Sequence, residues 1–214
     1  MLKTRRELII IKRFLKFILT LVIILLISMF AYKFIVKEYN DKMDKKYQDE
    51  IKNMSKEDLE VVDKVIALAK EREGQEYTWG GKGEIVTKER LEELISYYGE
   101  SYYPLDKKAY IGKQGFDCSG LTYWTYKTVT NINIGYSTIE QQDVLKDYKV
   151  DMNDIQPGDL IFTTRHVVMY MGKGKIIHSA SRNAYPIGGI KTDSVNYFKS
   201  GNAYRPIDYI NSLK

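Results

Sequence analysis

The side chains best suited to chemistry in this sequence are one thiol and two imidazoles. Cys118 is the only cysteine among 214 residues, and His166 and His178 are the only histidines. A thiolate is a good nucleophile, but a free thiol with a pKa of about 8.5 is mostly protonated at neutral pH. A neighbouring imidazole or the N-terminus of a helix can activate it. These residue types indicate acyl transfer through a covalent acyl-enzyme, provided that the fold brings them together.

Each of these residues also has an ordinary structural role. A lone cysteine is often a small buried apolar side chain, and a strand histidine is often structural. The three could also be zinc ligands with an open fourth position, although no second cysteine or carboxylate pattern supports a metal. We expect no metal and no cofactor. The positions of the three residues taken together favour catalysis, because the sole cysteine stands at a predicted helix start and both histidines stand at paired positions in the β-rich half.

The residues around Cys118 predict that it begins a helix. Asp117 is a typical N-cap, and a helix is expected over residues 118–129. The positive end of the helix dipole would then face the sulfur, and the small pair Ser119-Gly120 would leave room for a substrate. The position of the thiol therefore favours its ionised form.

The two histidines are predicted to lie on neighbouring antiparallel strands. The β-rich runs 166–171 and 175–178 are separated by Gly172-Lys173-Gly174, which is a hairpin signal. His166 and His178 would then face each other across the strand pair, so that one could orient the other as in a catalytic triad.

The remaining pattern predicts an α+β fold in which helices pack on a central antiparallel sheet. Capping residues at Ser55 and Ser137 precede helical periodicity, a further helix is expected over 87–98, and a strand is expected over 160–163. Helices come first along the chain and strands afterwards, as in α+β domains. We expect a single folded domain at 55–214, which is long enough for one core.

The N-terminal part differs from the rest. Residues 14–36 are almost wholly apolar and long enough to span a bilayer, which takes roughly 20 residues. The segment 1–13 is basic, so the positive-inside rule predicts a single-pass membrane anchor with a cytoplasmic N-terminus and an extracytoplasmic domain. A cleaved signal peptide is the alternative, although no A-x-A-like site follows the apolar run. A lipoprotein is not expected, because no cysteine directly follows the span.

Residues 37–54 are predicted to form a charged spacer. Apolar side chains recur every four residues in it, so it either continues the membrane helix or forms a flexible tether. As a helix, 37–53 would be about 25 Å long.

The net charge of +5 belongs to the N-terminal part. Residues 1–50 hold 11 Lys and Arg against 6 Asp and Glu, whereas the remaining residues hold 22 of each. The predicted exported domain is neutral, so no nucleic-acid partner is expected.

Four motifs resemble those of the NlpC/P60 cysteine peptidases, papain-like enzymes that cut peptidoglycan stem peptides. In chain order they are Tyr77–Gly81 (YTWGG), Phe116–Gly120 (FDCSG), Gln156–Phe162 (QPGDLIF) and His166–Gly172 (HVVMYMG) followed by His178. The resemblance covers roughly Leu59 to Asp208 and implies a papain-like NlpC/P60 fold. It implies Cys118 as the nucleophile, His166 as the base and His178 as the group that holds the His166 ring.

The resemblance also implies a substrate. The reaction would be hydrolysis of the γ-D-glutamyl to diamino-acid bond of a stem peptide, with Tyr77, Asp117 and Ser119 recognising the free amino terminus of that peptide. The Cys118 N–H and the Tyr77 hydroxyl are candidate oxyanion donors. The alternative is a catalytically silent, membrane-anchored binding or assembly protein of a secretion or conjugation apparatus, whose envelope partners the sequence does not name.

Residues 82–115 depart from the family pattern as a long insertion with its own helix. It carries five tyrosines, Tyr97, Tyr98, Tyr102, Tyr103 and Tyr110. We expect it to flank the cleft and to select substrates by stacking on sugars or peptides, the alternative being a subdomain that packs only on itself. The connection Thr163–Arg165 is short and would narrow the cleft beside His166.

Overall fold

A computed structural model describes residues 4–184 and 187–214. The chain divides into two compact units between Lys46 and Tyr47. The second unit therefore begins ahead of the predicted domain boundary at residue 55. Residues 1–3 of the predicted basic segment 1–13 lie outside the described residues.

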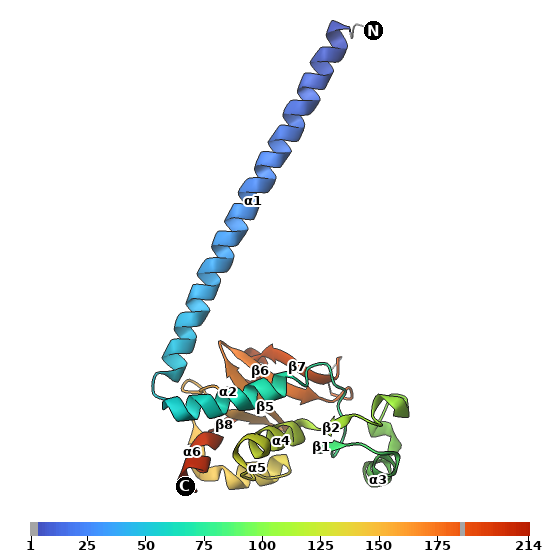
Figure 1. Ribbon diagram of the computed structural model, residues 1–214, viewed down its shortest axis with the longest axis vertical. Helices are drawn as coiled ribbons and strands as arrows, with labels where there is room; N and C mark the ends of the chain where they lie inside the picture. Colours follow the sequence, from blue (N-terminus) through green and yellow to red (C-terminus); the bar gives the residue numbers. More distant parts are fainter. Residues whose placement is uncertain (1–3, 185–186) are drawn as a thin grey trace. The chain divides into compact units, whose positions relative to one another are not determined.

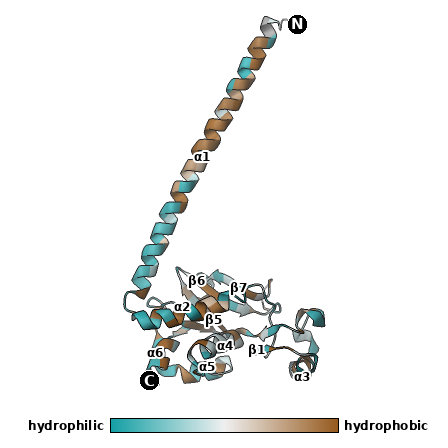
Figure 2. Ribbon diagram, viewed as in Figure 1, coloured by the Kyte–Doolittle hydropathy of each residue, from teal (hydrophilic) through white to brown (hydrophobic). Residues whose placement is uncertain are grey.

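Helix α1 extends over Arg5–Ile51. Its residues up to Lys46 belong to the first unit, and those from Tyr47 onward belong to the second. Figure 2 shows a largely hydrophobic stretch of α1 followed by a hydrophilic one. Within the described part of the chain, α1 is the one helix long and apolar enough to cross a membrane, judged by length and composition. The spacer is helical as far as Ile51, as in the first of its two predicted alternatives.

The second unit is built on a six-stranded sheet in which every neighbouring pair is antiparallel. The spatial order is β3-β8-β4-β5-β6-β7. The strands are β3 (Lys149–Val150), β4 (Leu160–Thr163), β5 (His166–Gly172), β6 (Lys175–Ala180), β7 (Gly189–Ser194) and β8 (Asn202–Tyr204). The predicted α+β class and the strands expected over 160–163, 166–171 and 175–178 are confirmed.

Two helices cover one face of the sheet (Figure 1). Helix α4 (Cys118–Thr130) packs on β5 and β6, and α2 (Lys56–Lys70) packs on α4. Leu121 of α4 is fully buried and shares one apolar cluster with Met169 and Ile177 of the sheet. Burying a leucine contributes about 1.5–3 kcal/mol relative to exposure, so this contact helps to fix α4 on the strands.

The helix starts lie where the capping signals predict them. Ser55, Asp117 and Ser137 each accept a backbone N–H three residues further along the chain. The other helices are α3 (Lys88–Tyr98), α5 (Thr138–Val144), α6 (Pro206–Ser212) and the short 3₁₀ turns η1 (Glu100–Tyr102), η2 (Lys107–Ala109), η3 (Lys146–Tyr148) and η4 (Val195–Phe198).

The insertion begins and ends on a small sheet of its own. Strand β1 (Lys82–Ile85) pairs antiparallel with β2 (Gln114–Phe116), and α3 lies between them in sequence. A separate apolar cluster holds this region together; its buried members are Val86, Leu91, Leu94, Tyr103 and Tyr110. The cluster also takes in Trp79, so the insertion packs on itself and on the YTWGG segment.

The end of α1 is hydrogen-bonded to the turn between β5 and β6. Glu50 accepts hydrogen bonds from the Tyr170 hydroxyl at 2.5 Å and from the backbone N–H of Lys173 at 3.1 Å. The Lys173 ammonium lies 5.4 Å from the centre of the Tyr47 ring. The residues from Tyr47 onward are thus part of the folded domain.

Candidate active site

Cys118 is the first residue of α4 and is only 7% exposed. Burial, followed by the nearby Asp117 carboxylate, raises the pKa of its thiol to about 11. Backbone hydrogen bonds from Val167 and Ser119 and the nearby Lys82 ammonium act in the opposite direction. Because burial dominates, the resting thiol is protonated at neutral pH and needs a base to become a nucleophile.

A glycine contact holds the thiol-bearing turn in place. A Cβ on Gly120 would lie 1.9 Å from the carbonyl oxygen of Gly81, so only glycine fits at this position. The backbone N–H of Asp117 donates to the same Gly81 oxygen at 3.0 Å. The YTWGG and FDCSG motifs are therefore the two sides of one close backbone contact.

The structure brings the two histidines together on β5 and β6. Met169 pairs with Ile177, so Val168 is the residue of β5 that lies opposite His178. His166 is two residues before Val168 and therefore lies on the same face of the sheet as His178. His166 Nε2 and His178 Nδ1 are 2.8 Å apart. The thiol is hydrogen-bonded to the backbone of Val167, directly after His166, so all three predicted residues meet where α4 begins and β5 begins.

Asp193 extends this arrangement beyond the residues singled out from the sequence. His178 Nε2 lies 3.1 Å from Asp193 Oδ2, and the Lys191 ammonium lies 2.9 Å from the same oxygen. Asp193 stands on β7, a strand that the sequence did not predict. The one usable signal is the spacing Lys191-x-Asp193, which places both side chains on one face of a strand.

These contacts set the protons of both imidazoles. Burial lowers the pKa of His166 to about 3 and that of His178 to about 4, although the bond to Asp193 partly opposes the second shift. Both rings are therefore neutral at pH 7. A carboxylate only accepts hydrogen bonds, so His178 carries its proton on Nε2 and accepts at Nδ1. His166 then donates from Nε2, so its Nδ1 is the nitrogen that carries no proton.

Tyr77 places a phenol next to the thiol. Its hydroxyl is hydrogen-bonded to Cys118, and burial, followed by the charges of Cys118 and Asp117, raises its pKa well above the ordinary value. The Tyr77 ring packs edge-on against Trp79, with ring centres 5.4 Å apart. The hydroxyl therefore remains a proton donor over the whole physiological pH range.

Asp117 and Ser119 hold a lysine of this chain. The Lys82 ammonium lies 2.6 and 2.8 Å from the two carboxylate oxygens of Asp117 and 3.0 Å from Ser119 Oγ. Lys82 comes directly after the YTWGG motif, and the sequence analysis did not single it out. Its side chain is 24% exposed and that of Asp117 11%.

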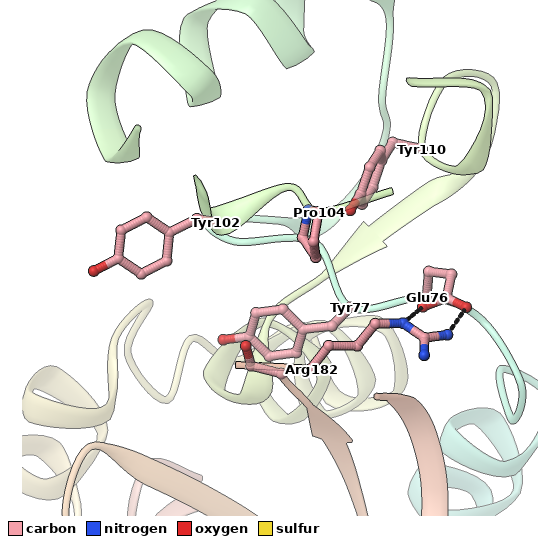
Figure 3. Close-up of a pocket in the computed structure, with 7 residues that line it drawn as sticks. Glu76, Tyr77, Tyr102, Pro104, Tyr110 and Arg182 are labelled. Atoms are coloured by element: carbon pink, nitrogen blue, oxygen red, sulfur yellow. Dashed lines mark hydrogen bonds and ion pairs between the residues drawn. The ribbon is translucent and has the colours of Figure 1, made fainter. Parts of the chain in front are cut away.

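A small pocket lies beside Tyr77 (Figure 3). The insertion supplies Tyr102, Pro104 and Tyr110 to its lining, while Ser181 and Arg182 come from the segment after β6. In Figure 3 the Arg182 guanidinium points toward Glu76, which it binds through two hydrogen bonds of 2.6 and 3.1 Å. The pocket therefore has one wall from the insertion and one from the segment that follows β6.

The five tyrosines of the insertion divide into two kinds. Tyr103 and Tyr110 are buried in the apolar cluster of the insertion, whereas Tyr97 is 82% exposed and Tyr102 is 39% exposed. Tyr98 and Tyr102 both pack against Trp79, at 6.0 and 4.8 Å between ring centres.

In residues 4–184 and 187–214, no three His, Cys, Asp or Glu side chains are grouped to hold a metal.

Curated relatives match the part of the chain that carries this site. Murein DD-endopeptidase MepH of Escherichia coli K12 is 35% identical over 74 residues, which are 31% of this chain and 27% of that protein. A probable endopeptidase of Haemophilus influenzae is 34% identical over 93 residues, which are 40% of this chain and 53% of that protein. The chain thus matches about a quarter to a half of the length of these relatives.

A solved structure agrees with the fold. The P60 domain of antigen MAP1204 from M. avium subspecies paratuberculosis is 21% identical and superposes with a TM-score of 0.50, over 70% of this chain and 97% of that one. The sequence profile of the NlpC/P60 family matches residues 74–200, more than half of the chain, from the turn before Tyr77 to a point just ahead of β8. The chain belongs to the NlpC/P60 family.

Proposed function

We propose that this protein is a membrane-anchored peptidoglycan endopeptidase that cleaves stem peptides through an acyl-enzyme on Cys118. The observation that carries the proposal is the hydrogen-bonded series His166–His178–Asp193 beside the thiol-bearing end of α4. The endopeptidases among the curated relatives support the same reaction class.

The chemistry begins with proton transfer. His166 Nδ1 takes the thiol proton, and the sulfur attacks the carbonyl carbon of the scissile amide. The Cys118 N–H at the helix N-terminus and the Tyr77 hydroxyl donate to the developing oxyanion. When the tetrahedral intermediate collapses, the C–N bond breaks and the imidazolium of His166 protonates the leaving amine.

Deacylation uses the same base. Water attacks the thioester while His166 accepts its proton, and the thiol leaves with a proton returned by the imidazolium. His178 keeps the His166 ring in place, and Asp193 fixes the tautomer of His178. No step requires a metal or a cofactor.

The bond we propose is the γ-D-glutamyl to diamino-acid bond of the stem peptide. A Bacillus cereus relative named gamma-D-glutamyl-L-lysine dipeptidyl-peptidase is 40% identical over 73 residues, 30% of this chain and 21% of that protein. MepH, by contrast, bears the name of a DD-endopeptidase. Mass analysis of the products separates the two bonds, because cleavage at each leaves fragments of different composition.

The deciding experiment is digestion of purified peptidoglycan by the full chain in detergent, beside its Cys118→Ala variant. We expect soluble stem-peptide fragments from the wild type only, and loss of activity after iodoacetamide but not after a chelator. Activity that survives the substitution would end the thiol mechanism. Peptidoglycan binding by both proteins without any cleavage would instead favour the silent binding protein.

A further inference from the structure

We propose that Lys82 is a specificity-determining residue whose ammonium occupies the place of a substrate amino terminus at Asp117. The site would then accept stem peptides whose amino end is acylated. This inference rests on the proposed function and sharpens its substrate class. It replaces the expectation that Asp117 and Ser119 recognise a free amine.

The Asp117 carboxylate has no remaining capacity for a second cation. Its Oδ1 accepts hydrogen bonds from the Gly120 N–H at 2.6 Å, from Ser119 Oγ at 3.0 Å and from the Lys82 ammonium at 2.8 Å. Its Oδ2 accepts from the Gly80 N–H at 3.2 Å and from the same ammonium at 2.6 Å. A carboxylate offers about four lone-pair sites, and five contacts already use them.

The charge of the site is equally satisfied. Asp117 is 7% exposed, and the lysine that pairs with it comes from β1, the strand that follows the Gly80-Gly81 turn. The positive charge of Lys82 offsets the charge of this carboxylate through short, charge-assisted hydrogen bonds, which are stronger than neutral ones. A substrate ammonium would therefore meet the positive charge of Lys82 instead of an unpaired carboxylate.

The chemical consequence concerns the state of the substrate. A stem peptide that is still joined to its glycan strand has an amide at its amino end and carries no positive charge there. Such a peptide avoids repulsion by Lys82, whereas a released peptide with a free amine does not. The protein should therefore act before any amidohydrolase step that separates the stem peptide from the glycan.

The test compares two synthetic stem peptides that differ only in N-acetylation, with the full chain in detergent. We expect the wild type to cleave the acetylated peptide at least as fast as the free-amine peptide. Lys82→Ala should shift the ratio of the two kcat/KM values at least tenfold toward the free amine. The ratio cancels any effect of Lys82 on the thiol, which both peptides share.

Lys82→Arg keeps the charge and should keep the wild-type ratio, and Lys88→Ala, an exposed lysine at the start of α3, serves as the matched control. A wild type that prefers the free-amine peptide more than tenfold would overturn the proposal, as would an unchanged ratio in a folded Lys82→Ala protein. If neither peptide is cleaved, the proposed hydrolase fails. In that case the role of Lys82 is decided by binding. The affinities of both peptides are measured for the Cys118→Ala variant and for the double variant Cys118→Ala, Lys82→Ala. We expect the first variant to bind the acetylated peptide at least as tightly as the free-amine peptide, and the second to shift the ratio of affinities toward the free amine.

Discussion

Among individual residues, Asp193 determines where the protons of the site lie. Its carboxylate accepts a hydrogen bond from the Nε2–H of His178. Through His178 Nδ1, this bond dictates that Nδ1 of His166 is the nitrogen left unprotonated. Lys191 holds the Asp193 carboxylate from its other side. Burial alone would raise the pKa of Asp193, but the bonds from Lys191 and His178 lower it, so it stays ionised.

Replacing Asp193 with alanine should lower kcat/KM by roughly 10- to 100-fold, the range seen when a group orienting an imidazole is removed. Without its acceptor, His178 can carry its proton on Nδ1 and reverse the tautomer of His166. Steady-state kinetics with a fluorogenic stem peptide measures this loss. Asp193→Asn should restore part of the rate, because an amide oxygen still accepts from Nε2. Equal rates for Asp193→Ala and the wild type would contradict the assigned role.

The imidazoles of the partly buried His166 and the buried His178 should also make the fold sensitive to acid. Their folded pKa values of about 3 and about 4 lie below the ordinary 6.5, so the unfolded chain binds more protons between these values. The stabilisation that comes from keeping these two imidazoles neutral is complete above pH 6.5, and it is lost as the pH falls toward 4. Urea unfolding at pH 7 and pH 5 should show lower stability at pH 5.

The control for this pH effect is His178→Gln, which should flatten the dependence. This control is needed because Asp159 has the opposite effect on the pH dependence of stability. Burial raises the pKa of Asp159 to about 6, so the stabilisation from its protonation is present below pH 3.8 and is lost as the pH rises through about 6. An unchanged difference between pH 7 and pH 5 in His178→Gln would count against the histidines as its source.

Residue type alone was sufficient to select Cys118, His166 and His178 as candidates, because the chain offers no other thiol or imidazole. Lys82 and Asp193 could not be found in this way. Lysine and aspartate are abundant in the sequence, and what distinguishes these two is the register of β1 and β7. Both strands are short or polar on one face, so their periodicity is weak.

At the level of elements, the insertion has a buried apolar cluster that stabilises it and a side chain that lines a pocket on the rest of the domain. Its cluster around Leu91 and Leu94 explains why it packs on itself, and Tyr102 reaches the pocket beside Tyr77. Deleting the whole segment would remove the packing on Trp79. Point substitutions therefore test its role in substrate choice better than a deletion.

Tyr102→Ala should change the relative cleavage rates within a panel of muropeptides by about 2- to 13-fold, since loss of one stacking contact costs about 0.5–1.5 kcal/mol. Tyr97→Ala is the matched control, because Tyr97 is exposed on the same insertion but does not line the pocket. Chromatography of the muropeptide digests gives the rates. Identical product patterns for Tyr102→Ala and the wild type would show that Tyr102 does not select substrates.

The sequence was informative where elements carry strong local signals. Capping residues located α2, α4 and α5, and the Gly172-Lys173-Gly174 turn located the central hairpin. It was uninformative for β3 and β8, which span two and three residues and exist only because the sheet supplies partners. Such strands follow from tertiary pairing rather than from local preference.

For the whole molecule, the apolar part of α1 leads us to expect a retained anchor. The full chain should stay with the membrane fraction after carbonate extraction, with the intact mass of the unprocessed chain. A chain starting at Tyr47 should be soluble, because it lacks residues 14–36. A soluble mature form that begins shortly after residue 36 would instead identify α1 as a cleaved signal peptide.

The order of strands in the sheet has a consequence for biosynthesis. β8 is the last strand along the chain, yet it lies between β3 and β4 and hydrogen-bonds to both. While the nascent chain is still shorter than about 200 residues, the apolar β4 has an open edge that invites pairing with other chains. The domain therefore completes its sheet late in synthesis, and chaperone protection of that edge is most needed just before Asn202 emerges.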